Sequence, residues 1–480
     1  MIDLAAFNMI KAGAETNTRI FTPQKIVKEM LDALPPEIWN SHTTFLDPAV
    51  KSGVYLVEIF NRLMESPEVI KDFPDKQERA KHILENQLFG IAIDDFDCLI
   101  AQRNLYGQIN PTGNIRVISD YKQRIKDKNK TNIVKSIEKV FLKEGEKVKF
   151  DIVVGNPPYQ DATQSIYQHF VDMSLLLSKR FVYMITKNNW INSDTLSITR
   201  DNMIKAGLVY VKNYPVTSEL FENASVAVSI FGIDKEHKGL THCVEIRENK
   251  ITNDFIADLR TMPIVFTNEM EYNIFTKVKN DLVLGHFGQL TYPSECFRIA
   301  PNGTVGRGNN KYVLNDFEQK SDEHSITVIY MSTDKKPYYK YINEHDVPAR
   351  QELINKHKVV CGRILSNDNM VIRNINITEK KSVCTSSWGI LFAHDELSVS
   401  QNVASYIATK FFRFMTKYLC EDGTIVVSAY RFSCVPQQDF TNNSDIDWSQ
   451  SIADIDRQLY EKYNLSDEEI DYIEKTIKPM

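Results

Sequence analysis

Asp151-Ile-Val-Val-Gly-Asn-Pro-Pro-Tyr-Gln160 joins a short apolar run to a stiff loop. Its three β-branched residues are typical of a buried strand, and the glycine after them marks the end of that strand. The two prolines fix φ and remove two backbone donors. We therefore expect the Asn156 side chain and the Pro157 carbonyl to be held outward as acceptors, with the ring of Tyr159 beside them.

This loop offers no general base, nucleophile or metal ligand, so it is poorly suited to hydrolysis. It suits a planar substrate with an exocyclic NH2 group, whose nitrogen is a weak nucleophile because its lone pair is delocalised. The Asn156 oxygen and the Pro157 carbonyl would each accept one N–H and localise that lone pair. Tyr159 would stack on the ring and fix its orientation. The electrophile would have to be a good one, such as the sulfonium methyl group of S-adenosylmethionine.

Strands and helices alternate on both sides of this loop. A strand at residues 43–46 leads into the small-residue loop 47–53 and then into an apolar helix. Further strands are expected over residues 87–93, 115–118, 181–185, 209–211 and 226–233. The alternation favours a doubly wound α/β domain with a mostly parallel sheet, in which ligands bind at the carboxyl ends of the strands.

The length of 480 residues exceeds what one hydrophobic core usually supports, so we expect at least two domains. The alternation of strands and helices fades after about residue 265. In this second part, the cluster at residues 410–414 interleaves basic and aromatic side chains. It suits either contact with nucleic acid or an amphipathic helix with its phenylalanines inward. Ser466 and Glu469 have the spacing of a capping box and predict a helix in the tail.

The net charge of −6 is unevenly distributed. Only four of the 57 Lys and Arg residues, but 11 of the 63 Asp and Glu residues, lie from Gln437 onward. The acidity therefore belongs to the tail, and the near-neutral body can still carry a basic groove for nucleic acid. One candidate is the run Lys122, Arg124, Lys126, Lys128 and Lys130, which opens a lysine-rich stretch that resembles an exposed excursion.

Cysteine usage and hydropathy indicate the cellular compartment in which the protein works. The seven cysteines form no Cys-x-x-Cys pair and no histidine cluster has ligand spacing, which argues against a metal site and a disulfide framework. No signal peptide or run of eighteen apolar residues is found. We expect a cytoplasmic protein without membrane contact.

The Asn156-Pro157-Pro158-Tyr159 loop, in the order of elements described above, resembles the catalytic motif of the S-adenosylmethionine-dependent DNA adenine-N6 methyltransferases of restriction-modification systems, in their gamma arrangement. The resemblance implies a class I methyltransferase fold and S-adenosyl-L-methionine as the cofactor, with no metal. It also implies that Tyr159 stacks on the target base, and Phe231 in the closing strand becomes a candidate to hold that base from the other side.

The resemblance also implies a cofactor site. In this family a Thr-Pro pair at a helix start lies against the methionine part of the cofactor, and a small-residue loop follows the first strand. Ile93 would pack on the adenine, Asp120 would receive the adenine amine, and Asp94 or Asp95 would hold the ribose. The residues implied as cofactor contacts are Phe21, Thr22, Pro23, Asp47, Pro48, Ala49, Ser52, Gly53, Ile93, Asp94, Asp95, Asp120 and Asn156.

Two positions depart from the family pattern. Lys51 replaces a glycine of the cofactor loop, so the loop would approach the cofactor less closely there or would place its ammonium group on the cofactor carboxylate. Ala92 stands where many class I methyltransferases have an acid that holds the ribose, so Asp94 or Asp95 would take over. These departures keep a second reading open, that of a DNA-binding protein with a decayed cofactor site.

The resemblance covers nearly the whole chain and implies three parts. Residues 1–265 would form the S-adenosylmethionine-binding catalytic domain, residues 266–440 an α+β DNA target-recognition domain, and residues 441–480 an acidic helical tail. The implied activity is methyl transfer to the 6-amino group of an adenine flipped out of double-stranded DNA. A restriction endonuclease for the same sequence, if there is one, would be a separate chain.

Other methyltransferases carry similar loops. Enzymes that act on RNA or on protein glutamine are one alternative, although they generally lack the upstream Thr-Pro element and the long downstream region. A cytosine-N4 enzyme is closer, but its loop usually begins with Ser rather than with Asn.

Overall fold

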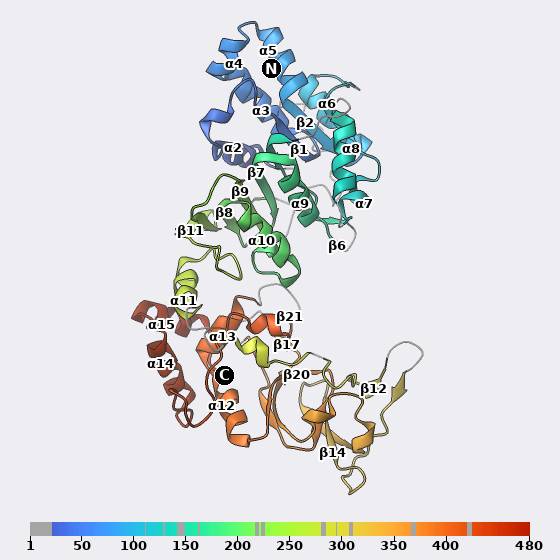
Figure 1. The fold of residues 1–480 in the computed structure, drawn as a ribbon, viewed down its shortest axis with the longest axis vertical. Coiled ribbons are helices and arrows are strands. Elements are labelled where there is room, and N and C mark those ends of the chain that lie inside the picture. The colour runs from blue at the N-terminus through green and yellow to red at the C-terminus, as the bar shows by residue number, and fades with distance from the viewer. Residues whose placement is uncertain are drawn as a thin grey trace. The chain divides into compact units, whose positions relative to one another are not determined.

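The computed structural model describes residues 22–110, 112–127, 130–141, 149–161, 164–216, 220–221, 226–279, 285–293, 295–306, 311–365, 371–419 and 425–480. The chain divides into two compact units, one ending at Glu269 and one beginning at Met270 (Figure 1). The acidic tail from residue 441 is part of the second unit. Within the described ranges, no helix is long and apolar enough to cross a membrane.

A nine-stranded sheet organises the first unit, in the order β11-β10-β8-β9-β7-β4-β1-β2-β3. The neighbours from β7 to β3 are parallel, whereas β9 runs antiparallel between β7 and β8. This is the doubly wound, mostly parallel sheet of a class I methyltransferase, so the predicted fold class is confirmed. The strands are β1 (Phe45–Val50), β2 (Leu88–Ala92), β3 (Ile115–Val117), β4 (Phe150–Gly155), β7 (Ser178–Lys187), β8 (Leu208–Tyr214), β9 (Val228–Asp234), β10 (Thr241–Arg247) and β11 (Lys250–Ala257).

Helices cover the sheet on both faces. Ile152 and Val154 of β4 lie in the core cluster that also holds residues of α2, α3 and α6, while the fully buried Val153 between them points to the other face. On one face of the sheet, α3 packs against α2 and α6. On the other face, α9 packs against α7, α10 and β4. Burial on both sides explains why β4 reads as an uninterrupted apolar run. The helices are α2 (Gln24–Asp32), α3 (Val54–Glu65), α4 (Pro67–Asp72), α5 (Lys76–His82), α6 (Asp95–Tyr106), α7 (Tyr121–Ile125), α8 (Thr131–Phe141), α9 (Tyr167–Leu177) and α10 (Ser197–Lys205).

Two stretches of the first unit differ from the expectation. The first strand runs on to Val50, which pairs with Ala92 of β2, so the small-residue loop begins inside the strand. The lysine-rich stretch after residue 122 is not an exposed excursion throughout, because Ile125, Ile133 and Ile137 of α7 and α8 are fully buried. Isoleucines at helical spacing between the lysines give these helices an apolar face.

The second unit is built of small sheets followed by helices, an α+β arrangement. Its sheets have the orders β12-β13, β15-β14-β19, β18-β16-β20 and β17-β21. The strands are β12 (Thr304–Val305), β13 (Tyr312–Val313), β14 (Ile326–Met331), β15 (Pro337–Ile342), β16 (His357–Gly362), β17 (Ile364–Leu365), β18 (Asn376–Thr378), β19 (Ser382–Cys384), β20 (Trp388–His394) and β21 (Ile425–Val426). The helices are α11 (Glu269–Lys279), α12 (Leu397–Ala408), α13 (Lys410–Lys417), α14 (Ile452–Lys462) and α15 (Asp467–Thr476).

The basic and aromatic cluster at residues 410–414 lies in α13 and faces inward. Phe411, Phe412 and Phe414 are fully buried. Arg413 is only 1% exposed and donates hydrogen bonds to the carbonyls of Thr409 and Lys478. Of the two interpretations left open, the structure shows the packed amphipathic helix. The capping box of the tail is confirmed at the start of α15.

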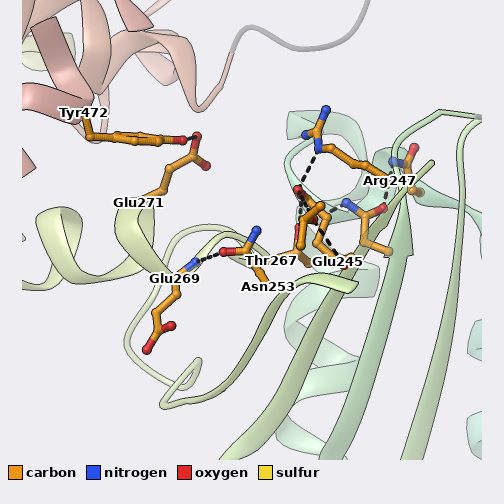
Figure 2. Close-up of polar contacts among 10 residues, drawn as sticks. Glu245, Arg247, Asn253, Thr267, Glu269, Glu271 and Tyr472 are labelled. Carbon is orange, nitrogen blue, oxygen red and sulfur yellow. Dashed lines mark hydrogen bonds and ion pairs between the residues drawn. The ribbon is translucent and has the colours of Figure 1, made fainter. Parts of the chain in front are cut away.

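Polar contacts tie the last residues of the first unit to its sheet (Figure 2). The buried Glu245 of β10 accepts a hydrogen bond from Arg247 at 2.8 Å and one from the Thr267 hydroxyl at 3.2 Å. The backbone N–H of Glu269 donates to the Asn253 side chain at 3.1 Å. Within the second unit, the Tyr472 hydroxyl donates to the Glu271 carboxylate at 3.2 Å, so α15 is tied to α11.

Asp151 should contribute to stability through Thr44 and Lys179. Its carboxylate accepts from the Thr44 backbone at 2.9 Å and hydroxyl at 2.7 Å, and Lys179 lies 3.0 Å away. Burial raises the pKa of Asp151, but these contacts outweigh it and hold the pKa below its ordinary value of 3.8. Because the folded-state pKa is depressed, the stabilisation is complete above pH 3.8 and disappears as the pH falls through the folded-state value.

We predict that Asp151→Asn lowers the free energy of unfolding at pH 7 by about 1–2 kcal/mol, and that the difference from the wild type shrinks in acid. Urea unfolding over a series of pH values measures this. Asp201→Asn, at an exposed position of α10, is the matched control and should change nothing. Equal unfolding midpoints for Asp151→Asn and the wild type at pH 7 would contradict the prediction.

Candidate functional site

The predicted catalytic loop leaves the sheet between β1 and β7, at the carboxyl end of β4. β4 pairs in parallel with β1 on one side and β7 on the other. A Cβ atom on Gly155 would come within 2.8 Å of the Asp47 carboxyl oxygen, so glycine lets β4 end close against β1. The loops that follow these two strands therefore leave the sheet side by side, at the carboxyl ends of its parallel strands.

The downstream side of the loop is held by three kinds of contact. The Tyr159 carbonyl accepts the N–H of Ile166 at 3.1 Å, and β5 (Gln160–Asp161) pairs with β6 (Gln164–Ser165). The Asp161 carboxylate lies 2.5 Å from the Lys126 ammonium and 3.9 Å from that of Lys122. Two lysines of the basic run thus fix the end of the loop.

Asn156 is 4% exposed, and its two amide atoms have different surroundings. Its nitrogen, Nδ2, donates to the Thr22 hydroxyl oxygen at 3.0 Å. Its oxygen, Oδ1, is buried and has no hydrogen-bond partner. A buried acceptor without a partner costs free energy, which is a reason to look for a ligand that would satisfy it.

Pro157 is buried, and Pro158 and Tyr159 are partly buried. The Tyr159 ring packs against the core cluster beneath α3, with the Tyr167 ring edge-on at a centroid distance of 6.4 Å. Its hydroxyl is buried without a hydrogen-bond partner, and burial raises the pKa of Tyr159 well above its usual range. Tyr159 therefore stays neutral at any physiological pH.

A small hollow joins the first loop to Asn156. It is lined by Thr22, Asp47, Ala49, Lys51, Ser52, Gly53, Val54, Tyr55 and Asn156. Gly53 is the N-cap of α3 and has a φ of 77°, a conformation that favours glycine. The structure thus brings together most of the residues predicted for the methionine end of the cofactor, from segments far apart in the sequence.

Burial raises the pKa of Asp47 to about 7, while the N–H of Ala49 and the charge of Lys51 act in the opposite direction. The hollow therefore combines an ammonium group, a carboxyl group that titrates near neutral pH, and the unpaired Asn156 oxygen. This set fits the amino-acid part of S-adenosylmethionine, which carries both an ammonium and a carboxylate group.

The residues predicted for the ribose and adenine lie at the ends of β2 and β3. Ile93 is partly buried directly after β2. Asp94 caps α6 and accepts from the backbone of Asp97 at 2.8 Å, whereas Asp95 is exposed in the first turn. Asp120 is exposed and precedes α7 with a φ of 56°. Because β2 and β3 follow β1 in the sheet, these side chains lie along the same edge as the hollow.

Three predicted residues have other outcomes. Pro23 is at the N-cap of α2, and its carbonyl accepts the first hydrogen bonds of that helix. Phe21 lies outside the described residues. Phe231 is fully buried in β9 and packs edge-on against Trp190 at 5.6 Å. It pairs with Met184 of β7 and faces away from the cluster that holds Tyr159, so the structure does not bring the two rings together.

Sequence reasoning missed two buried tyrosines that support the site. The Tyr121 hydroxyl donates to the Pro48 carbonyl at 2.7 Å and so anchors the first loop. Tyr55 of α3 lines the hollow and donates its hydroxyl to the Met30 sulfur at 3.2 Å. Tyr55, Ile59 and Leu63 repeat every four residues, and this spacing could have placed Tyr55 on the inner face of α3.

We predict that Asp47→Asn stabilises the protein in mild alkali. The unfolded chain loses the Asp47 proton near pH 3.8 and the folded protein keeps it until about 7, so stability falls as the pH rises between these values. The substitution removes this penalty while Asn can still accept from Ala49. At pH 8 the gain in the free energy of unfolding should be on the order of 2–4 kcal/mol. Urea unfolding at pH 5 and pH 8 tests this, and a variant no more stable than the wild type at pH 8 would contradict it.

Comparisons with known proteins agree with this description. Residues 86–211 match the model of the Eco57I restriction-modification methylase family, and this segment contains the Asn-Pro-Pro-Tyr loop. An uncharacterized adenine-specific methylase of Mycoplasma pneumoniae is 28% identical over an alignment of 242 residues, and the match covers 37% of this chain and 56% of that protein. The chain thus spans little more than half the length of this relative.

Solved structures of restriction-modification proteins also show some likeness. A modification subunit of a type I restriction enzyme from Vibrio vulnificus shares 15% identity over 52% of each chain, with a TM-score of 0.38. The DrdV–DNA complex shares 10% identity over 90% of this chain and 56% of that one, with a TM-score of 0.47. The match of residues 86–211, together with the curated relative, confirms the resemblance to the restriction-modification methyltransferases.

Proposed function

We propose that this protein transfers a methyl group from S-adenosylmethionine to the 6-amino group of adenine in double-stranded DNA, as the modification enzyme of a restriction-modification system. The observation that carries this proposal is the buried, unpaired Oδ1 of Asn156 at the end of β4. It lies beside a hollow whose side chains fit the amino-acid part of the cofactor. The adenine-specific name of the Mycoplasma relative supports the choice of base.

In this proposal Asn156 and Pro157 act on the adenine amine. The Asn156 Oδ1 and the Pro157 carbonyl each accept one N–H, so the nitrogen lone pair is withdrawn from the ring and becomes available for attack. Pro158 keeps the loop rigid. The cofactor supplies a methyl group activated by its sulfonium charge. As the nitrogen–methyl bond forms, the sulfur–methyl bond of the cofactor would break and leave S-adenosylhomocysteine, and the nitrogen would release one proton to solvent and stay neutral.

The adenine has to leave the base stack to reach this site, because Asn156 is buried at the end of an internal strand. Tyr159 is the ring that would meet the flipped base. Its hydroxyl is buried and unpaired, so its face rather than its polar tip is suited to the contact. Phe231 lies in the core, so the proposal assigns stacking to Tyr159 alone.

The two ends of the cofactor would be held by loops that follow different strands, all at the carboxyl ends of the parallel strands. Lys51 would bind its carboxylate, and Asp47 with the backbone from Pro48 to Gly53 would enclose the amino-acid part. At the other end, Asp95 is the better candidate for the ribose, because Asp94 already caps α6. Ile93 and Asp120 would face the adenine.

The remaining predictions concern partners. In this proposal the second unit recognises the DNA target sequence through its small sheets, and the acidic tail packs on it as a structural element. A cognate endonuclease would be a separate chain, and the protein would work in the cytoplasm. An RNA or protein-glutamine methyltransferase, or a DNA-binding protein with a decayed cofactor site, is the alternative. Against a decayed site stands the hollow itself, in which the polar groups remain in place.

We predict that adenines in one short motif become methylated in a methylation-deficient host that expresses this chain. Asn156→Ala should abolish the methylation, because it removes one of the two acceptors that activate the amine. Modification-sensitive long-read sequencing reads both the activity and the motif. The matched control is Asn132→Ala at an exposed position of α8, which should leave the methylation unchanged.

Two results would contradict the proposal. One is a soluble wild-type protein that binds S-adenosylmethionine but methylates no adenine in genomic DNA. The other is an Asn156→Ala variant that methylates DNA as fast as the wild type. A protein that binds DNA but not S-adenosylmethionine would instead support the decayed-site alternative.

A further inference from the structure

We propose that Thr22 is a positioning residue which, together with Tyr55 and Met30, fixes the end of the Asn156 amide that faces the substrate. This inference rests on the proposed function and gives Thr22 a task other than contact with the cofactor. We call these three side chains the Thr22 relay.

The Thr22 relay is a continuous line of buried side chains that starts at the loop and ends in the core. Asn156 donates from Nδ2 to the Thr22 oxygen at 3.0 Å. Thr22 lies close enough to Tyr55 to act on its pKa as a side-chain hydrogen-bond donor, and the Tyr55 hydroxyl donates to the Met30 sulfur at 3.2 Å. Asn156 and the three side chains of the relay are each at most 5% exposed. Water therefore does not compete with these bonds, and each partner determines the role of the next.

The sulfur of Met30 sets the direction of the relay. A thioether has no hydrogen to donate, so the Tyr55 hydroxyl has to donate to it. The Tyr55 oxygen then accepts the hydrogen of the Thr22 hydroxyl. The Thr22 oxygen, having given up its only hydrogen, can only accept from Asn156. The amide nitrogen therefore turns toward Thr22, and Oδ1 is left for the substrate.

This direction matters because the two ends of an amide have nearly the same shape. Packing alone would hold Asn156 equally well after a half-turn about its last torsion. In the turned state the amide NH2 would face the amino group of the adenine, and two donors would meet. Only the hydrogen-bond partners distinguish the productive state from the turned one, so the relay determines how often the loop is ready to react.

The relay keeps its direction at all working pH values. Burial raises the pKa of Tyr55 well above its usual range, and the hydrogen bond from Thr22 opposes this only in part. The Tyr55 hydroxyl therefore keeps the hydrogen that it donates to Met30. The four residues come from three parts of the fold: Thr22 and Met30 from α2 and the two residues before it, Tyr55 from α3, and Asn156 from the loop that follows β4.

The test compares Thr22→Val, Thr22→Ser and Tyr55→Phe in the full chain. The substrate is an unmethylated DNA duplex that carries the recognition motif found by sequencing. Valine keeps the shape of threonine but cannot hydrogen-bond, so kcat should fall by about 10- to 100-fold. The dissociation constant for S-adenosylmethionine, measured by calorimetry, should stay within about threefold. Thr22→Ser should restore kcat, and Tyr55→Phe should lower it less than Thr22→Val, because Thr22 can still accept from Asn156.

A second readout does not depend on methylation. In protein labelled with ¹⁵N-asparagine, the side-chain resonance that disappears in Asn156→Ala identifies the Nδ2 group. Without cofactor or DNA, the single substitution Thr22→Val should change the chemical shift of that resonance. Thr22→Ser should leave the chemical shift close to its wild-type value. This readout reports the relay even if the protein proves to methylate a different substrate.

The inference is overturned if Thr22→Val keeps the wild-type kcat, or if it weakens cofactor binding tenfold or more. The second result would place Thr22 on the cofactor instead. An unchanged Asn156 resonance in Thr22→Val would also overturn it. A wild-type protein that methylates no adenine refutes the proposed function, whereas an active wild type with a fully active Thr22→Val refutes the relay alone.

Discussion

The parallel pairing of β1 with β4 is the constraint on which the candidate site depends. Phe45 and Leu46 lie opposite Ile152 and Val153, which sets where both strands end. Because Gly155 has no side chain, the Asp47 carboxyl can lie against the last residue of β4. Two loops separated by about a hundred residues thus emerge side by side, one suited to an amino acid and the other to an aromatic amine. A shift of register by one residue would separate them.

The sequence predicts those parts of this site that depend on local patterns. The apolar run of β4, the stiff loop after it and the small residues after β1 are recognisable within windows of ten residues. The face on which Phe231 lies could not be predicted in this way, because it depends on the register of β9 against β7. The role of residues 410–414 depends on Thr409 and the distant Lys478, whose carbonyls satisfy Arg413. Contacts between distant residues, such as Tyr121 with Pro48, leave no trace in the local sequence.

The polar groups of the site are held at a cost in stability. The Asn156 Oδ1 and the Tyr159 hydroxyl are buried without partners, and the Asp47 carboxyl is buried where its charge is disfavoured. Each would be more favourable in water or with a partner. The surrounding core of α2, α3 and α6 supplies the stability that keeps them in place. The site therefore resembles other preorganised sites, in which groups are arranged for a ligand before it arrives.

The short helix α7 has a further consequence, because it joins the two ends of the site. Asp120, the residue predicted to face the adenine, directly precedes α7, and Lys122 in the first turn of α7 and Lys126 directly after it hold Asp161, two residues after Tyr159. A ligand that fixes the position of Asp120 would therefore also restrain the far side of the loop. By thermodynamic linkage, a loop occupied by its aromatic substrate would in turn favour the same position of Asp120. Two ligands that do not touch each other would then bind cooperatively, because α7 couples their two sites.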